Sequence, residues 1–460
     1  MTDTEMLLRA AMADEAEMID EFDDPWPRFA RQERAHRRNR RVRLAAAAAV
    51  LVAAVGVQTG TVPLPGWVPG IAIAGRSTAL TSAPTRGSLA GDTAFLDGLR
   101  REIKDVQDPG ELWKITDRSK IKFVYAADVA GHRLALALVP LRFGFLSDQA
   151  LIWYEGKAGA APAEMAENGR EDGGVTVSME MLGSADAEGF VVVVAPPDAS
   201  IAVSSGFSYT PAGRVKHNPP VVATGIAEVP LPRSPIEPGT TVTVTSDGST
   251  LFQGAATGGW AGQSGGDPQE PTDAMVSKAL GDRAFDPASL KQWLGWMLHD
   301  ARVPAAGTTV ALHWTGTVDG QPAALLTLRR QGSGVIAYAM HGDATTWRTD
   351  LRLLLPAAGA DTRPIAWRMR AEGKDDRTDQ VIVVAPRGTA RATLTVAGAA
   401  PVPLTLDPSG SAVTTLAPDA VATVTAYPAG GGAPASTPVT PFETDGGGIP
   451  GDTPKTRVVN

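Results

Sequence analysis

Residues 191–196 read VVVVAP, and residues 381–386 read VIVVAP, with five identities in six positions at an offset of 190 (381 minus 191). An unbroken β-branched run of this length, closed by proline, predicts a buried strand. GDTAF at 91–95 and GDRAF at 281–285 share the same offset, 281 minus 91. Because several landmarks fall at one spacing, the sequence predicts an internal duplication.

Each predicted copy, over 91–256 and 281–428, is expected to open with a helix and to continue as antiparallel strands. Asp286 has the position of an N-cap before the second helix. Hairpin turns are expected at Ala130-Gly131 and Asp319-Gly320, where a type I′ turn needs residues that tolerate positive φ.

The first 62 residues predict a membrane anchor. Residues 44–57 contain no polar side chain. Extended to residue 62, the segment has about 19 residues, enough to cross a hydrocarbon core. Arginines lie on its N-terminal side only, which directs the N-terminus to the cytoplasm. The residues that set this orientation are Arg37, Arg38, Arg40, Arg41 and Arg43. A cleaved signal peptide ending at the Ala-x-Ala of 72–74, or a buried alanine-rich helix, would be the alternative interpretations.

The predicted fold class is therefore α+β and mostly β, with a single transmembrane helix followed by two tandem helix-plus-antiparallel-β repeats. The localisation expected is a single-pass protein of the cell membrane, N-terminus cytoplasmic and C-terminal part extracytoplasmic. The predicted divisions are a cytoplasmic tail (1–43), the transmembrane helix (44–62), a stalk (63–90), repeat 1 (91–256), a linker (257–280), repeat 2 (281–428) and a disordered tail (429–460).

Composition excludes several classes of protein. The 460 residues contain no cysteine, so disulfide frameworks, thiolate metal sites and cysteine nucleophiles are excluded. The formal net charge of −8 argues against direct nucleic-acid binding, which usually needs a basic excess.

Candidate catalytic and metal-binding motifs are few. GQSGG at 262–266 matches G-x-S-x-G, but it lies in a glycine-rich stretch without the preceding strand that a nucleophile elbow requires. The six histidines show no i, i+4 pair, and the acidic runs at 164–172 and 374–379 lack the order of a calcium loop. The sequence therefore predicts no catalytic, cofactor-binding or metal-binding residues, and a protein that is not an enzyme.

The N-terminal segment has the pattern of a docking peptide. Apolar residues recur at helical spacing in an acidic stretch, and two aromatic residues follow around Pro27. Aromatic and apolar anchors dominate interfaces of this kind. The candidate partner-docking residues are Leu8, Met12, Ile19, Phe22, Trp26 and Phe29. An unstructured tail that only sets topology is the alternative.

The stretch FDDPWPRFAR at 22–31, followed by the arginine block and an Ala/Val span, resembles the N-terminus of actinobacterial single-pass membrane proteins associated with extracytoplasmic-function sigma factors, some of them putative anti-sigma factors. That resemblance implies a cytoplasmic segment that restrains a sigma factor and an exported part that receives a signal. The chain departs from zinc-binding anti-sigma domains, which resemble H-x-x-x-C-x-x-C, because it has no cysteine.

Two functions follow as expectations. The first is a membrane protein with exported β-rich binding or sensing repeats and a cytoplasmic segment that docks a sigma factor or another cytoplasmic regulator. The second is a cell-envelope binding or scaffold protein whose N-terminus is only an anchor. Both imply the lipid bilayer and an unidentified extracytoplasmic ligand as partners. An exported hydrolase is the third hypothesis, and it needs polar groups that converge in a pocket.

Overall fold

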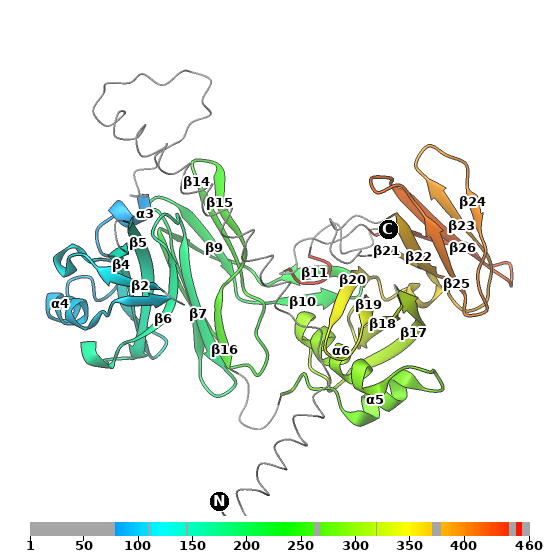
Figure 1. Ribbon diagram of the computed structural model, residues 1–460, viewed down its shortest axis with the longest axis horizontal. Helices are drawn as coiled ribbons and strands as arrows, with labels where there is room; N and C mark the ends of the chain where they lie inside the picture. The colour runs from blue at the N-terminus through cyan, green and yellow to red at the C-terminus, as the bar shows by residue number, and fades with distance from the viewer. Residues whose placement is uncertain are drawn as a thin grey trace, which may run out of the picture. The chain divides into compact units, whose positions relative to one another are not determined.

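The computed structural model describes residues 79–108, 111–143, 146–261, 267–318, 320–369, 379–440 and 448–452. These residues are mostly β-structure, with 27 strands against four α-helices and three short 3-10 helices (Figure 1). Residues 76–460 form one compact unit by their contacts.

The first part of the described chain is an antiparallel sheet with a helix packed on one face. The sheet has the order β1-β2-β4-β5-β6, with β3 also paired to β4. Its strands are β1 (Val106–Asp108), β2 (Glu111–Ile115), β3 (Lys122–Val129), β4 (His132–Phe143), β5 (Leu146–Lys157) and β6 (Ala166–Asp172). The turn expected at Ala130-Gly131 is confirmed, because both residues have positive φ and Val129 pairs with His132.

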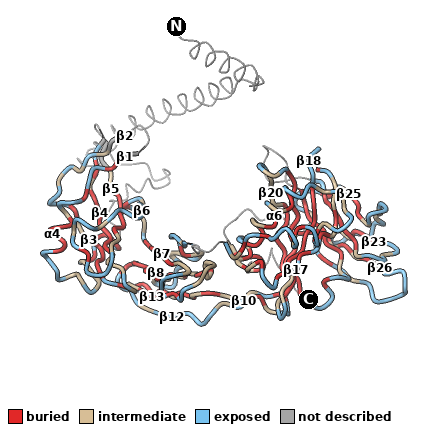
Figure 2. Tube along the Cα trace, turned by 90° about the horizontal axis from the view of Figure 1, so that it is seen from below, coloured by how far each residue is buried: buried red, intermediate tan, exposed pale blue. Residues whose placement is uncertain are grey.

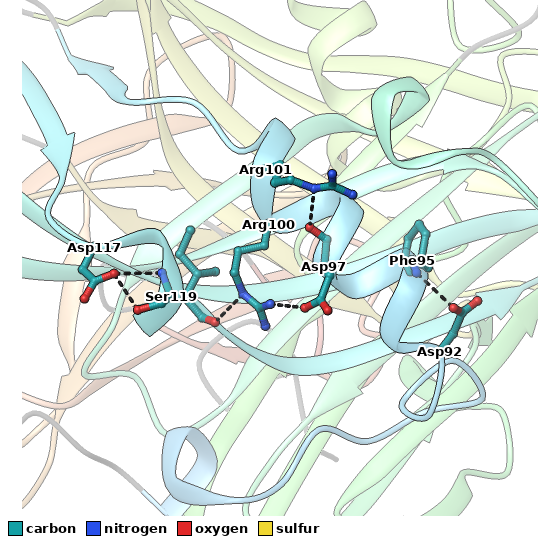
Figure 3. Close-up of polar contacts among 8 residues, drawn as sticks. Asp92, Phe95, Asp97, Arg100, Arg101, Asp117 and Ser119 are labelled. Carbon is teal, nitrogen blue, oxygen red and sulfur yellow. Dashed lines mark hydrogen bonds and ion pairs between the residues drawn. The ribbon is translucent and has the colours of Figure 1, made fainter.

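Helix α4 (Thr93–Glu102) covers one face of this sheet, while the short α3 (Ala79–Ser82) precedes it. The side chain of Asp92 caps α4 by accepting a hydrogen bond from the backbone N–H of Phe95 at 3.0 Å. Arg100 pairs with Asp97 and donates from Nε to the carbonyl of Ile121 at 3.2 Å (Figure 3). The helix is therefore fixed both at its N-terminus and against the loop before β3.

Two further sheets form a β-sandwich beside the first sheet. One has the order β13-β8-β7-β16 and the other β12-β9-β14-β15. Their strands are β7 (Ser178–Ser184), β8 (Gly189–Val194), β9 (Ser200–Ser204), β12 (Val221–Thr224), β13 (Ile226–Leu231), β14 (Thr241–Ser246), β15 (Ser249–Ala255) and β16 (Gly258–Ala261).

Strand β8 confirms the buried strand expected from VVVVAP, and its packing explains the unbroken valine run. Val191 and Val193 face the core between the two sandwich sheets. Val192 and Val194 face a second core shared with the first sheet. Since both faces are covered, no position on the strand favours a polar residue.

Two helices and a four-stranded meander follow. The helices are α5 (Asp273–Leu280) and α6 (Pro287–Asp300), and the strands are β17 (Thr308–Val318), β18 (Gln321–Arg330), β19 (Val335–Gly342) and β20 (Trp347–Leu355). The predicted N-cap of α6 is confirmed, because the carboxylate of Asp286 accepts from the N–H of Ser289 at 2.8 Å. Trp293 and Leu294 of α6 then pack on one face of the sheet.

A second sandwich packs on the other face of this sheet. Its sheets have the orders β21-β22-β25 and β24-β23-β26-β27. The strands are β21 (Ile365–Arg368), β22 (Gln380–Val384), β23 (Thr389–Val396), β24 (Val402–Leu404), β25 (Ser411–Thr415), β26 (Ala422–Pro428) and β27 (Ala435–Pro438). Strand β22 is again buried on both faces, since Val381 and Val383 fill the sandwich core while Ile382 and Val384 face the meander. Figure 2 shows the buried residues of these strands in red.

A hairpin of β10 (Phe207–Thr210) and β11 (Arg214–His217) extends from the first sandwich to the α6 core. The Tyr209 hydroxyl donates to the carbonyl of Ala301 at 3.0 Å, and the N–H of Ala357 donates to the carbonyl of Pro211 at 2.8 Å. Residues far apart in sequence are thereby joined around α6.

The predicted fold class and the predicted tandem repeat are wrong. The described residues are mostly β and do not repeat one helix-plus-β unit. The first sheet has six strands and the later one has four, and the β10–β11 hairpin has no counterpart among the described residues of the later part. The sequence matches at an offset of 190 come from similar buried strands and not from a duplicated unit. Strands that are buried on both faces are rich in alanine and valine, so their sequences resemble each other.

The single-pass localisation is also corrected. No helix in the described ranges has both the length and the apolar character needed to cross a bilayer. The span expected at 44–62 lies outside those ranges. The stretch expected to be a disordered tail contributes β27 and the buried Ile449.

Candidate functional site

The functional residues predicted from the sequence lie outside the described residues. This holds for the docking residues Leu8, Met12, Ile19, Phe22, Trp26 and Phe29 and for the orientation residues Arg37, Arg38, Arg40, Arg41 and Arg43. Ser264 of the G-x-S-x-G match lies outside them too. A different candidate site comes from the structure.

A pocket of about 790 Å³ opens where the β17–β20 sheet meets the second sandwich. Its apolar wall is formed by residues of the core between these two layers, among them Leu325, Val335, Leu355, Ile365 and Val384. Pockets of this size commonly hold small organic molecules. The apolar wall means that a ligand entering here would bury hydrocarbon.

Three arginines line the pocket, Arg283, Arg363 and Arg387, and Nη1 of Arg363 donates to the carbonyl of Ser436 at 3.3 Å. Arg283 follows α5 in a turn, and Arg387 lies in the turn after β22 beside Gly388, whose φ is +80°. Burial, and then the positive charge of Arg387, lower the pKa of Arg283. Neither the Arg283 nor the Arg387 guanidinium has a hydrogen bond or ion pair within the described part of the chain. The two guanidinium groups repel each other, and no carboxylate lies between them. A bound anionic ligand would reduce this repulsion, so the position favours an anion.

His313 also lines the pocket. Its Nε2 lies 2.8 Å from the hydroxyl of Thr327. Burial lowers the pKa of His313, and the charges of Arg283, Arg329 and Arg387 lower it further against the opposing effect of Asp361. The imidazole is therefore neutral near pH 7 and can hydrogen-bond to a ligand without carrying charge.

A β-bulge places His313 in the pocket. The pairing of β17 with β18 shifts between Leu312 and Trp314, so His313 lies opposite no residue of β18. Leu312 packs in the core with α6, but Trp314 packs in the core with the sandwich. Without the bulge these two residues would share one face, because side chains alternate along a strand.

The carboxylates beside the pocket already have partners. Asp361 pairs with Nη2 of Arg329 at 2.7 Å. Burial alone would raise the pKa of Asp407, but hydrogen bonds from Ser409 and Ser411 together lower it. Arg329 therefore neutralises Asp361, whereas Asp407 stays ionised and is held by the serine donors, and among the described residues neither carboxylate pairs with Arg283 or Arg387.

Sequence reasoning did not find this pocket. In the sequence, Arg283 stands out only as part of the GDRAF landmark, and His313 only as an isolated histidine in an expected strand. The sequence contained only a weak indication of the site. Arg387 and Gly388 follow a predicted buried strand, and a turn at this place can expose a positively charged side chain.

Comparisons with known proteins give no family. No family model matches this chain, and no curated protein matches it. One solved structure, the intramolecular trans-sialidase from Ruminococcus gnavus in complex with oseltamivir carboxylate, shares 10% identity over 68% of this chain and 91% of its own, with a TM-score of 0.12. A likeness at that level supports neither a shared fold nor a shared activity.

Proposed function

We propose that the chain is a ligand-binding protein whose pocket between the β17–β20 sheet and the second sandwich takes a small organic anion with an apolar portion. One observation carries the proposal: Arg283 and Arg387 lie without carboxylate partners at the edge of a pocket that has an apolar wall. The guanidinium groups would bind the anionic group, and the apolar wall would bury the rest.

The arrangement fits binding better than catalysis. His313 bonds to the Thr327 hydroxyl, and both nearby carboxylates serve other partners. A general base needs a free acceptor aimed at a reacting group, so a proton-transfer role gains no support from these contacts. That the chain is not an enzyme stays a prediction.

Calorimetry with hexanoate tests the proposal, with 1-hexanol as the uncharged ligand of equal chain length. Hexanoate should bind more tightly than hexanol, and Arg387→Ala should weaken hexanoate about tenfold, because it removes a charge-assisted hydrogen bond. Arg214→Ala is the matched control, since Arg214 is also exposed but lies outside the pocket. Equal binding of hexanol, or equal losses in the two variants, would refute the proposal.

Docking of a cytoplasmic regulator by residues 1–43 stays a separate prediction. Co-purification with this segment as bait tests it, with a scrambled segment as control. Enrichment of a sigma factor or another regulator over the scrambled bait is the expected result, and its absence would end this part of the interpretation.

A further inference from the structure

A second cleft, of about 760 Å³, lies over the outer face of the β12-β9-β14-β15 sheet. Its floor contains the cross-strand row of Ala202, Thr243 and Gln253, and the adjoining row contains Ser204 and Thr241. These side chains point away from the sandwich core because their neighbours along the strands, Val203 and Val242 among them, fill it.

Two ionisable side chains in the wall of this cleft contact carboxylates. His217 Nε2 lies 2.7 Å from a carboxylate oxygen of Asp452. Nη2 of Arg302 lies 3.1 Å from a carboxylate oxygen of Glu237. The cleft therefore differs from the pocket at Arg283 and Arg387, where the cations lack such partners.

Most uncharged polar side chains of the cleft are without partners in the described part of the chain. Ser204 donates to the carbonyls of Gly206 and Asn218, but the hydroxyls of Thr241 and Thr243 and the side-chain amides of Gln253 and Asn218 form no hydrogen bond there. A hydroxyl both donates and accepts, and an amide offers two donors and an acceptor. Side by side in a concave surface, these groups match a ligand that carries several hydroxyls.

We propose that this cleft binds an uncharged, polyhydroxylated ligand of the sugar class, at a site separate from the anion pocket. The threonine hydroxyls and the Gln253 amide bind the ligand hydroxyls across strands β14 and β15. No Phe, Tyr or Trp side chain lines the cleft within the described residues, so stacking on such rings adds nothing. The affinity expected from hydrogen bonds alone is weak, on the order of millimolar.

Saturation-transfer NMR with the full chain tests the proposal, with maltose, cellobiose and sucrose as neutral probes. Thr243→Val replaces the hydroxyl by a methyl group of similar volume and should weaken the bound sugar about five- to tenfold. Thr245→Val is the matched control, because Thr245 lies on the same face of β14 but outside the cleft.

The expected result is saturable transfer to at least one neutral sugar. Thr243→Val should weaken the binding of that sugar, whereas Thr245→Val and Arg387→Ala should leave it unchanged. Transfer to none of the three sugars at tens of millimolar would overturn the proposal. Equal losses in the two threonine variants, or displacement of the sugar by hexanoate, would overturn it as well. Since Arg387→Ala affects only the other pocket, failure here is distinguishable from failure of anion binding.

Discussion

At the scale of single residues, the titration of His313 governs how the pocket responds to pH. Burial and the neighbouring arginines keep the pKa of His313 below its ordinary value. As the pH falls through that lowered pKa, the imidazole becomes a further cation beside Arg283 and Arg387. The affinity for hexanoate should therefore rise as the pH is lowered from 8, over the range in which the carboxylate of hexanoate stays ionised.

Calorimetry across this range with His313→Gln gives the comparison. Glutamine keeps a group that can hydrogen-bond to Thr327 but does not titrate, so the extra affinity at low pH should disappear. An unchanged pH profile in this variant would show that another group is responsible.

Glu180 links stability to pH. Burial, and then the charges of Glu155 and Glu171, raise the pKa of Glu180 from 4.5 to about 7. The folded state therefore favours the protonated carboxyl. The stability this gives is present below pH 4.5 and is lost as the pH rises to about 7, by up to about 3 kcal/mol.

Glu180→Gln should remove this loss, because the amide cannot ionise and still accepts the hydrogen bond from Asn168. Urea unfolding should show the variant to be more stable than the parent at pH 8, with little gain at pH 4.5. Glu188→Gln, at an exposed position, should show no such gain. A gain for Glu180→Gln that is the same at both pH values would refute the assignment.

Trp314 and Trp367 lie in the core between the β17–β20 sheet and the second sandwich. Their rings meet edge to face, with centroids 5.9 Å apart. Trp314 Nε1 donates to the Ser411 hydroxyl at 3.0 Å, whereas Trp367 Nε1 is buried without a partner among the described residues.

Trp314→Phe should therefore cost more stability than Trp367→Phe, by about 1 kcal/mol, because only the first loses a buried hydrogen bond. Urea unfolding of the two variants measures this difference. Equal losses, or a greater loss for Trp367→Phe, would contradict the assigned contacts.

At the scale of elements, the β10–β11 hairpin depends on Gly213. Its φ is +71°, and a Cβ there would lie 2.5 Å from the backbone nitrogen of Pro356. Gly213→Ala should therefore both strain the turn and push the hairpin away from the residues after β20.

Gly131→Ala is the control, because Gly131 has a φ of +84° but a Cβ there would meet no other atom within 4 Å. It should cost about 1 kcal/mol of backbone strain. Gly213→Ala should cost clearly more and speed hydrogen exchange at the Tyr209 amide. Similar losses and unchanged exchange would mean that the hairpin does not dock as described.

Local signals in the sequence predicted several elements correctly. The valine runs are the buried strands β8 and β22, Ala130-Gly131 forms a hairpin turn, and Asp286 caps α6. Each depends on residues close together in the chain. The bulge at His313 was not predictable, because it reverses the alternation of β17 and is stabilised by two cores on opposite faces.

At the scale of the whole molecule, the anion pocket combines parts of the chain that no sequence window contains. Arg283, His313 and Arg387 come from a turn, a bulged strand and a later turn, and only the packing of sheet on sandwich brings them together. The sequence pointed instead to the arginines at 37–43, because charges that are adjacent in the chain form a cluster that can be recognised without the structure. The similar strands also led to the wrong prediction of a duplicated unit. The spacing of sequence matches does not show which strands pair with one another in a sheet.

Anomalous diffraction from crystals soaked with 6-bromohexanoate locates a bound carboxylate and its hydrocarbon chain separately. We expect a bromine peak beside the apolar wall at Val335 and Ile365, with carboxylate density at Arg283 and Arg387. The peak should vanish in Arg283→Ala, Arg387→Ala crystals soaked in the same way. A bromine peak elsewhere only, or an unchanged peak in the double variant, would contradict the account.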